Sequence, residues 1–314
     1  MNLLGILTYA ISFTISSNKI LEVSFDIKNK FKIPLDNMSD EDRKLLELLF
    51  WAIRYGADFV TDKNTEIKNY RDKTLKITEY NNKKIVETST GIKLYIDSIH
   101  PGNTIVECFV SKIHLINSNE LWKDKIVIDV GAECGDTPLY YASKGATVYA
   151  FEPIKENYDS MLRNIALNTH ISGKIIPINA AIGKDQTLRF YQDPESPTVG
   201  ASFVYNKGGK NALMVEAQGY TIQTVFKKFN IKHVDLLKMD CKGCEFFLTD
   251  DDLKNVDSVK IEYTTTGTSH KLDDLKNLLE RGGFEYMIYR TDPITRISNR
   301  VFGHIYGKKT NAIT

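Results

Sequence analysis

From about Lys125 onward, short apolar runs of strand length alternate with longer segments of helical character. We expect strands at Ile126–Val130, Thr147–Phe151, Ile175–Asn179, Val234–Met239, Ser258–Tyr263, Phe284–Tyr289 and Arg300–Tyr306. Between the first three strands we expect a helix through Leu139 and Tyr140 and another over Ile154–Asn168. Strands that alternate with helices form a mostly parallel sheet, which binds its ligands at the carboxyl ends of the strands.

The last two expected strands are separated only by the loop 290–299, so they must pair as an antiparallel hairpin. We therefore predict an α/β domain with a Rossmann-like sheet of seven strands, the last two of which form the hairpin. This ending distinguishes a methyltransferase sheet from a dinucleotide dehydrogenase sheet. With 314 residues, the chain has room for this domain and a smaller one.

The loop after the first strand carries the motif D-V-G-A-E-C-G-D-T at residues 129–137. Gly131 and Gly135 lack a Cβ and let the backbone approach a ligand closely, and Asp136 is a natural cap for the following helix. The glycine spacing differs from the G-x-G-x-x-G of dinucleotide-binding loops. Asp129 would repel a phosphate but attract the cationic amino group of S-adenosylmethionine. The alternative is an ordinary tight turn between strand and helix.

Glu152 ends the second strand, twenty-three positions after Asp129. An acidic residue at about this distance and at a strand end typically accepts hydrogen bonds from a ribose diol. The alternative is a surface carboxylate that caps the next helix. Asn179 and Ala180 end the third strand and would then lie beside an adenine ring.

Three spaced blocks of sequence are similar to the signature of FkbM-type methyltransferases: residues 129–137, residues 151–153 with Asn157 and Asn168, and residues 235–245. The resemblance extends from about Ile105 to Gly307. It implies a class I methyltransferase fold, S-adenosylmethionine as donor, and usually O-methylation of a hydroxyl on a sugar, glycan or secondary metabolite. The donor-binding residues it implies are Asp129, Gly131, Ala132, Gly135, Thr137, Glu152, Pro153, Asn157, Asn179, Ala180 and Asp240.

The family usually has a second acidic residue after the fourth strand, where this chain has Lys242. A cation there would favour an anionic acceptor, or it is simply a solvated lysine. Methyl transfer to an alcohol needs positioning and a base. Asp240, at the end of the fourth strand, is our first candidate for that base, followed by Glu245 and Glu262. His100 and His270 fall in loops and are weaker candidates.

The chain has four cysteines: Cys108, Cys134, Cys241 and Cys244. So few thiols in a chain of this size argue against a disulfide scaffold and favour a cytoplasmic location. The C-x-x-C spacing of Cys241 and Cys244 suggests redox or zinc chemistry, but no second pair has ligand spacing, so we expect buried packing residues. Asp240 and Glu262 could supply two ligands for a divalent metal, yet we predict no metal.

The first hundred residues carry no motif linked to chemistry. We predict a smaller α+β region at 1–104, serving as a lid, substrate-shaping or assembly module, and the methyltransferase domain at 105–314. A helix is expected at Ser39–Tyr55, and strands at Leu75–Tyr80, Lys84–Thr88 and Ile92–Ile96. Residues 1–18 carry no charged side chain, and we predict a buried or partner-facing helix there, with weak membrane-surface contact as the alternative.

The chain has 41 basic and 40 acidic side chains and no long run of one sign, so we expect a small-molecule or glycan acceptor and no nucleic-acid partner. One alternative is an N-methyltransferase acting on a protein or nucleic acid, but D-C-K-G replaces the Asn/Asp-Pro-Pro-Tyr-like motif typical of amine methylation. Another is a catalytically silent binding module, which only Lys242 supports.

Overall fold

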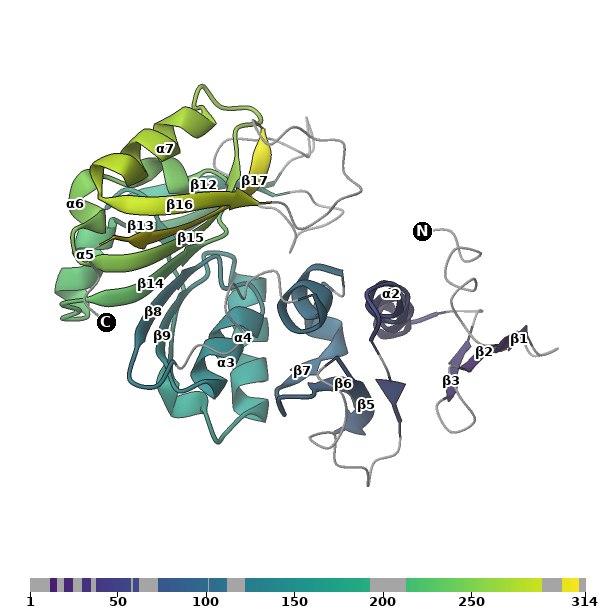
Figure 1. Cartoon of the computed structure of the whole chain (residues 1–314). Coiled ribbons are helices and arrows are strands. Elements are labelled where there is room, and N and C mark those ends of the chain that lie inside the picture. The colour runs from purple at the N-terminus through teal and green to yellow at the C-terminus, as the bar shows by residue number, and fades with distance from the viewer. Residues whose placement is uncertain are drawn as a thin grey trace. The chain divides into compact units, whose positions relative to one another are not determined.

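The computed structural model describes residues 12–15, 20–24, 30–34, 38–57, 59–61, 73–100, 102–111, 122–192, 213–289 and 301–310. The chain divides into two compact units (Figure 1). The first comprises Met1–Ser118 and Ala166–Asn168, and the second comprises Asn119–Ile165 and Thr169–Thr314. All the residues of the predicted donor and acceptor sites except Asn168 and His100 belong to the second unit.

The second unit is built on a seven-stranded sheet. In spatial order its strands are β10 (Ile175–Ile178), β9 (Thr147–Phe151), β8 (Ile126–Val130), β14 (Val234–Met239), β15 (Val256–Thr264), β17 (Phe302–Lys309) and β16 (Phe284–Tyr289). All neighbours are parallel except the two pairings of β17, which is antiparallel to both β15 and β16. This order, with the terminal hairpin, confirms the predicted class I methyltransferase sheet.

Helices cover both faces of this sheet. They are α3 (Asp136–Ser143), α4 (Lys155–Leu167), α5 (Ile222–Lys228), α6 (Asp250–Leu253) and α7 (Leu272–Arg281), with the short 3-10 turns η4 (Ser172–Lys174) and η6 (Cys244–Phe247). Figure 1 shows α3 and α4 on one side and α5, α6 and α7 on the other. The central strands are therefore buried on both faces, which is why β8 and β14 read as nearly continuous apolar runs.

Register brings three functional positions to one edge of the sheet. Val130, the last residue of β8, lies opposite Phe151 of β9 and Met239 of β14. The residues that follow these three strand ends are Gly131, Glu152 and Asp240. Since these strands are parallel, all three residues lie at the carboxyl edge, where such sheets bind ligands.

A second sheet in this unit has the order β11 (Ala181–Ile182), β13 (Leu213–Tyr220) and β12 (Thr187–Gln192). The sequence analysis missed it. Polar residues such as Arg189, Glu216 and Gln218 interrupt these strands and hide their apolar pattern, while Leu188 and Phe190 form a small core of their own with Ala181.

The first unit contains a four-stranded sheet of β4 (Phe59–Val60), β5 (Leu75–Tyr80), β6 (Lys83–Thr88) and β7 (Lys93–Tyr95), the helix α2 (Asp40–Arg54), the turn η2 (Ile96–Ser98) and the π-helical segment η3 (Gly102–Val110). Ser39 caps α2, as predicted, because its hydroxyl accepts the Asp42 N–H at 3.1 Å. Apolar residues of α2, led by Leu48 and Leu49, are fully buried.

The helix predicted within residues 1–18 is wrong over Ser12–Ile15, which form strand β1 and pair with β2 (Ile20–Ser24); β3 (Lys30–Pro34) completes this small sheet. The reason is visible in the sequence: Ile11, Phe13 and Ile15 alternate with polar residues, and period two is the strand pattern. The rest of 1–18 lies outside the described residues. No helix in the described part of the chain is long and apolar enough to cross a membrane.

Candidate donor and acceptor site

The turn from β8 into α3 depends on two glycines with left-handed backbone. Gly131 has φ 77°, and a Cβ there would overlap the carbonyl group of Asp240. Gly135 has φ 90° and is the N-cap of α3, and a Cβ there would lie 2.9 Å from Cγ of Met161. These glycines thus allow two segments of the chain to meet closely. The prediction that they also admit a ligand stays a prediction.

Asp129 is completely buried and forms an ion pair with Lys238, its neighbour across the strands. The Lys238 Nζ lies 2.8 Å from Oδ1 of Asp129 and also donates to the Gly131 carbonyl oxygen at 3.3 Å. The Thr137 hydroxyl donates to the other Asp129 oxygen. Burial alone would lower the pKa of Lys238, but the carboxylates of Asp129, Asp240 and Asp136 raise it well above its ordinary value. The lysine is therefore a permanent cation beneath the loop.

Glu152 is 4% exposed and accepts two backbone hydrogen bonds, from the N–H of Glu133 at 2.9 Å and of Ile154 at 2.8 Å. The Asn157 side chain donates to it as well. Burial raises the pKa of Glu152 to about 7, against these hydrogen bonds. The carboxylate is thereby fixed in orientation. Since a carboxylate has about four acceptor positions and three are occupied, one remains for a ribose hydroxyl.

Two further carboxyl groups join this cluster. Burial and the nearby Asp136 raise the pKa of Glu133 to about 8, and burial raises that of Asp136 to about 7. Asp136 is the first residue of α3 rather than its cap: the cap position belongs to Gly135, which has no side chain to donate or accept. The left-handed turn at Gly135 ends one residue earlier than predicted, so the helix begins at Asp136 itself. Together with Asp129, Glu152 and Asp240, these groups make the strand ends strongly acidic.

Asp240 follows β14 and is held by its backbone N–H, which donates to the Val130 carbonyl at 2.9 Å. Its side chain is 24% exposed, and Oδ1 lies 3.7 Å from Nζ of Lys242. Lys242 has φ 48°, in the left-handed region that non-glycine residues seldom adopt. The lysine that departs from the family pattern is therefore an ion partner of our first candidate base.

The other two catalytic candidates have different surroundings. Glu245 is fully buried and accepts the N–H of Gly243 at 2.7 Å and of Thr264 at 3.2 Å, and burial raises its pKa to about 7. It joins the turn after β14 to the end of β15. The Glu262 side chain is 14% exposed and pairs with Nε2 of His304 at 3.1 Å, across strands β15 and β17.

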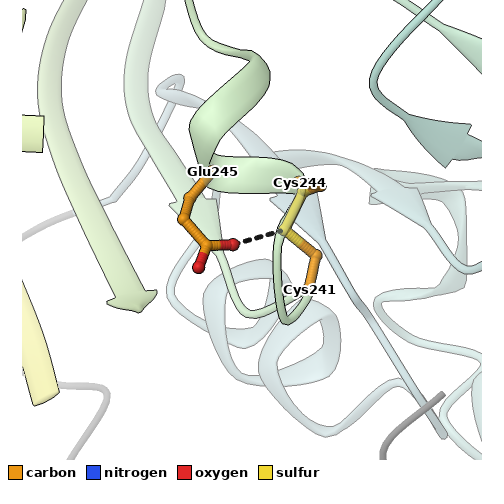
Figure 2. A group of neighbouring side chains, drawn as sticks. All are labelled: Cys241, Cys244 and Glu245. Atoms are coloured by element: carbon orange, nitrogen blue, oxygen red, sulfur yellow. Dashed lines mark hydrogen bonds between the residues drawn. A yellow bond between two sulfur atoms is a disulfide. The ribbon is translucent and has the colours of Figure 1, made fainter. Parts of the chain in front are cut away.

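Cys241 and Cys244 are joined by a disulfide, with 5.5 Å between their Cα atoms (Figure 2). Both cysteines pack as expected, Cys244 within the core and Cys241 against it, but their disulfide was not predicted; the three-residue spacing across this tight turn brings the sulfurs together. Cys108 and Cys134 are buried and lie outside this disulfide.

The remaining candidate residues of the second unit contact other residues of the protein. The Asn179 side chain donates to the carbonyls of Glu152 and Pro153, at 2.8 and 3.1 Å, and so fixes the loop after β9. Ala180 is 1% exposed and belongs to the core. His270 stacks on Phe246, with ring centroids 4.5 Å apart.

Two residues belong to the first unit. Asn168 exchanges hydrogen bonds with the backbone of Lys93, at 2.9 and 2.7 Å. The backbone N–H of His100 donates to the Thr104 hydroxyl at 3.1 Å.

Sequence reasoning missed Lys238, Glu133 and His304. Lys238 left a signal, since a lysine inside the otherwise apolar end of β14 needs a buried anion. Glu133 left a weaker one, as an acidic residue between the two glycines of the loop. His304 left none, because its partner Glu262 is forty-two positions away and register alone brings them together.

Among the described residues, two groups place three ligand atoms close enough for a metal ion: Cys241, Cys244 and Glu245, and His233, Asp235 and Asp257. Neither group contains Asp240 or Glu262, the pair considered from the sequence.

The chain is similar in part to several known proteins. The curated AMB antimetabolite synthetase AmbE of Pseudomonas aeruginosa is 26% identical over 234 residues, an alignment that covers 62% of this chain and only 11% of that protein. A methyltransferase FkbM structure from Methylobacillus flagellatus KT is 17% identical with a TM-score of 0.42, over 62% of this chain and 46% of that one. The structure of M. jannaschii TYW2 in complex with AdoMet is 17% identical with a TM-score of 0.39, and the match covers 76% of this chain and 87% of that one.

The methyltransferase FkbM domain model matches residues 129–286, which contain the glycine loop, the acidic strand ends and the turn after β14. The chain belongs to this family of S-adenosylmethionine-dependent methyltransferases.

Proposed function

We propose that this chain transfers a methyl group from S-adenosylmethionine to a hydroxyl oxygen of a small molecule or glycan. The observation that carries the proposal is the acidic edge of the sheet, where Glu133, Asp136, Glu152 and Asp240 gather around one glycine loop. The donor carries a sulfonium and an ammonium, so it is a suitable ligand for such a cluster. The bound donor supplies a methyl group activated by the sulfonium charge.

The residues present fit this donor. Burial raises the pKa values of Glu133, Asp136 and Glu152, and repulsion by neighbouring carboxylates raises that of Glu133 further, so these carboxyls are poorly stabilised as anions. A cation among them would relieve that repulsion. Glu152, already oriented by two backbone N–H groups, would accept a ribose hydroxyl. Asp129 is already paired with Lys238, so we assign it to holding the loop in place instead of contacting the donor directly.

Asp240 is the residue we assign to the acceptor, as base or positioning carboxylate. It follows β14, its side chain is partly exposed, and its backbone is fixed to β8. Glu262 with His304 is a second carboxylate–imidazole pair, joined across β15 and β17 with 3.1 Å between Nε2 and Oε2. Glu245 is engaged by backbone N–H groups, and we assign it to shaping the turn.

The acceptor class rests on two supports. The nearly equal numbers of basic and acidic side chains give no reason to propose a nucleic acid as acceptor. The curated relative is an antimetabolite synthetase, which fits an acceptor among secondary metabolites, although the match covers only a small part of that protein. Two of the four cysteines, Cys108 and Cys134, are buried outside the disulfide, and the low cysteine content of the chain supports a cytoplasmic location.

The experiment is calorimetric titration of S-adenosylmethionine into wild type, Glu152→Ala and the matched control Glu156→Ala, an exposed position on α4. Loss of one hydrogen bond to a charged group, worth about 1.5–3 kcal/mol, should weaken donor binding by about 10-fold or more in Glu152→Ala only. Unchanged affinity would remove the ribose assignment. Mass spectrometry of extracts incubated with isotope-labelled donor would then identify the methylated acceptor, and a methylated nitrogen would refute O-methylation.

A further inference from the structure

The turn between β14 and η6 holds a chemical group that methyl transfer does not use. Cys241 and Cys244 close a small disulfide ring around Lys242 and Gly243, directly after Asp240 (Figure 2). The ring is formed by local residues of one turn and joins no distant parts of the fold. It therefore adds little of the chain-entropy stabilisation that disulfides give when they close long loops. A role other than cross-linking is indicated.

The two sulfurs differ in accessibility. Cys241 is half-buried, whereas Cys244 is 1% exposed and belongs to the core beneath the sheet edge. An external thiolate must approach the sulfur that it attacks along the S–S axis. The half-buried Cys241 is thus the sulfur open to attack, and Cys244 is the leaving group.

Glu245 is the third residue of this group, after Cys241 and Cys244. Its Oε2 lies 3.8 Å from Sγ of Cys241 and points toward the disulfide in Figure 2. A disulfide sulfur has no hydrogen to donate, so this contact is a hydrogen bond only when Cys241 is a thiol. The reduced turn therefore offers the Cys241 thiol a hydrogen-bond acceptor that the disulfide form cannot use.

We infer that Cys241 and Cys244 form a thiol–disulfide exchange site that reacts with low-molecular-weight thiols such as glutathione, and whose oxidised form holds Lys242 beside Asp240. Reduction proceeds in two displacements. The first thiolate bonds to Sγ of Cys241, the Sγ–Sγ bond breaks, and Cys244 leaves as a thiolate. A second thiolate attacks the external sulfur of this mixed disulfide and releases Cys241. The protons of the two external thiols pass to the two cysteines, and the products are the protein dithiol and one external disulfide.

The consequence for the turn follows from its backbone. Lys242 and Gly243, the two residues inside the ring, have φ 48° and 123°. The closed ring keeps Lys242 in its unusual left-handed conformation, with Nζ 3.7 Å from Oδ1 of Asp240. When the ring opens, this constraint is lost, and Lys242 is free to leave the ion pair. Disulfides of reducing compartments are usually transient and redox-sensing, which fits such a role.

The first test uses mass spectrometry of the full chain under native conditions. With oxidised glutathione, Cys244→Ser should gain one glutathione at Cys241, while Cys241→Ser should remain unmodified, because Cys244 is inaccessible. Cys108→Ala, in the first unit, should exchange as wild type does. Equal uptake at both cysteines, or uptake at neither, would overturn the assignment. So would a reduced protein that retains one added Zn²⁺ per chain and does not reoxidise, since the cluster of Cys241, Cys244 and Glu245 would then be a metal site.

The second test reads the position of Lys242 without any methyl acceptor. Limited acetylation followed by peptide mass spectrometry should modify Lys242 several-fold faster in the reduced protein, and in the Cys241→Ser/Cys244→Ser double variant, than in the oxidised protein. Lys276 is the matched control, because its side chain is 35% exposed, against 33% for Lys242, and it also pairs with an aspartate. A Lys242 rate that is the same in both redox states would refute the coupling to Asp240.

Discussion

Replacing Lys238 with methionine tests how the donor loop is held. The substitution keeps the length of the side chain and removes the cation, and it leaves Asp129 fully buried with the Thr137 hydroxyl as its remaining donor in the described structure. Removing one partner of a buried ion pair typically destabilises a protein by about 3–5 kcal/mol. The alternative for Asp129 is to become protonated. From an unfolded-state pKa of about 3.9, this costs about 4 kcal/mol at pH 7, because each unit is worth about 1.4 kcal/mol. Both routes give the same magnitude.

The stability of Lys238→Met should depend on pH, because Asp129 would bind a proton in the folded state. In Lys238→Met, burial raises the pKa of Asp129 with no lysine to oppose it, so the folded state binds a proton that the unfolded state releases above its own pKa. Stability of the variant therefore falls as pH rises. Its deficit relative to wild type should be about 3–5 kcal/mol near pH 7 and should shrink by about 1.4 kcal/mol for each unit by which the pH is lowered toward 4.

The assay is urea unfolding followed by tryptophan fluorescence. The chain has two tryptophans, and Trp51 lies in the first unit, so a Trp51→Phe background leaves Trp122 as the reporter of the second unit. Trp122 is 8% exposed and packs on Tyr141 of α3, with ring centroids 4.8 Å apart. The control is Asp129→Asn/Lys238→Met, which buries no charge and should recover most of the loss. A single variant within about 1 kcal/mol of wild type, or a deficit independent of pH, would refute the reasoning.

Three further predictions follow from the site. Gly131→Ala should prevent donor binding in calorimetry, because φ 77° and the clash with the Asp240 carbonyl force the loop to move; Gly56→Ala, at a similar φ of 79° with open space around it, is the control that keeps affinity. Donor binding near pH 7 should release protons, seen as a heat that depends on the buffer's ionisation enthalpy, because the raised pKa values of Glu133 and Glu152 fall when a cation binds; no buffer dependence would contradict this. Asp240→Asn should bind the donor normally and lose turnover of the acceptor that labelling identifies, and an active variant would exclude it as base.

The sequence predicted the parallel strands well because each is an apolar run bounded by turn residues. The ends of β8, β9, β14 and β16 coincide with the predicted ones. Where apolar and polar residues mix, the prediction failed. The small sheet that contains β13 was missed, and Ser12–Ile15 was assigned to a helix although its residues alternate as a strand does.

Prediction of the site from the sequence was limited in a similar way. Strand ends locate Glu152 and Asp240, because any residue after a parallel strand lies at the carboxyl edge. The partners of these residues depend on register and cannot be read from spacing. Asp129 was predicted to face the donor, but β14 places Lys238 opposite it. Glu245 was a catalytic candidate by position, and only the structure shows that backbone N–H groups occupy its oxygens.

Lys238 also explains how one short stretch can serve both halves of the reaction. Its ammonium contacts Asp129 and the Gly131 carbonyl, and Gly131 in turn packs against the backbone of Asp240. The loop assigned to the donor and the strand end assigned to the acceptor are thus one connected unit. In-line methyl transfer requires this, because misplacement by about 1 Å can reduce the rate about 100-fold. The disulfide turn begins at the next residue, beyond these contacts. A change there can alter the surroundings of the Asp240 side chain while the backbone that aligns the two substrates stays in place.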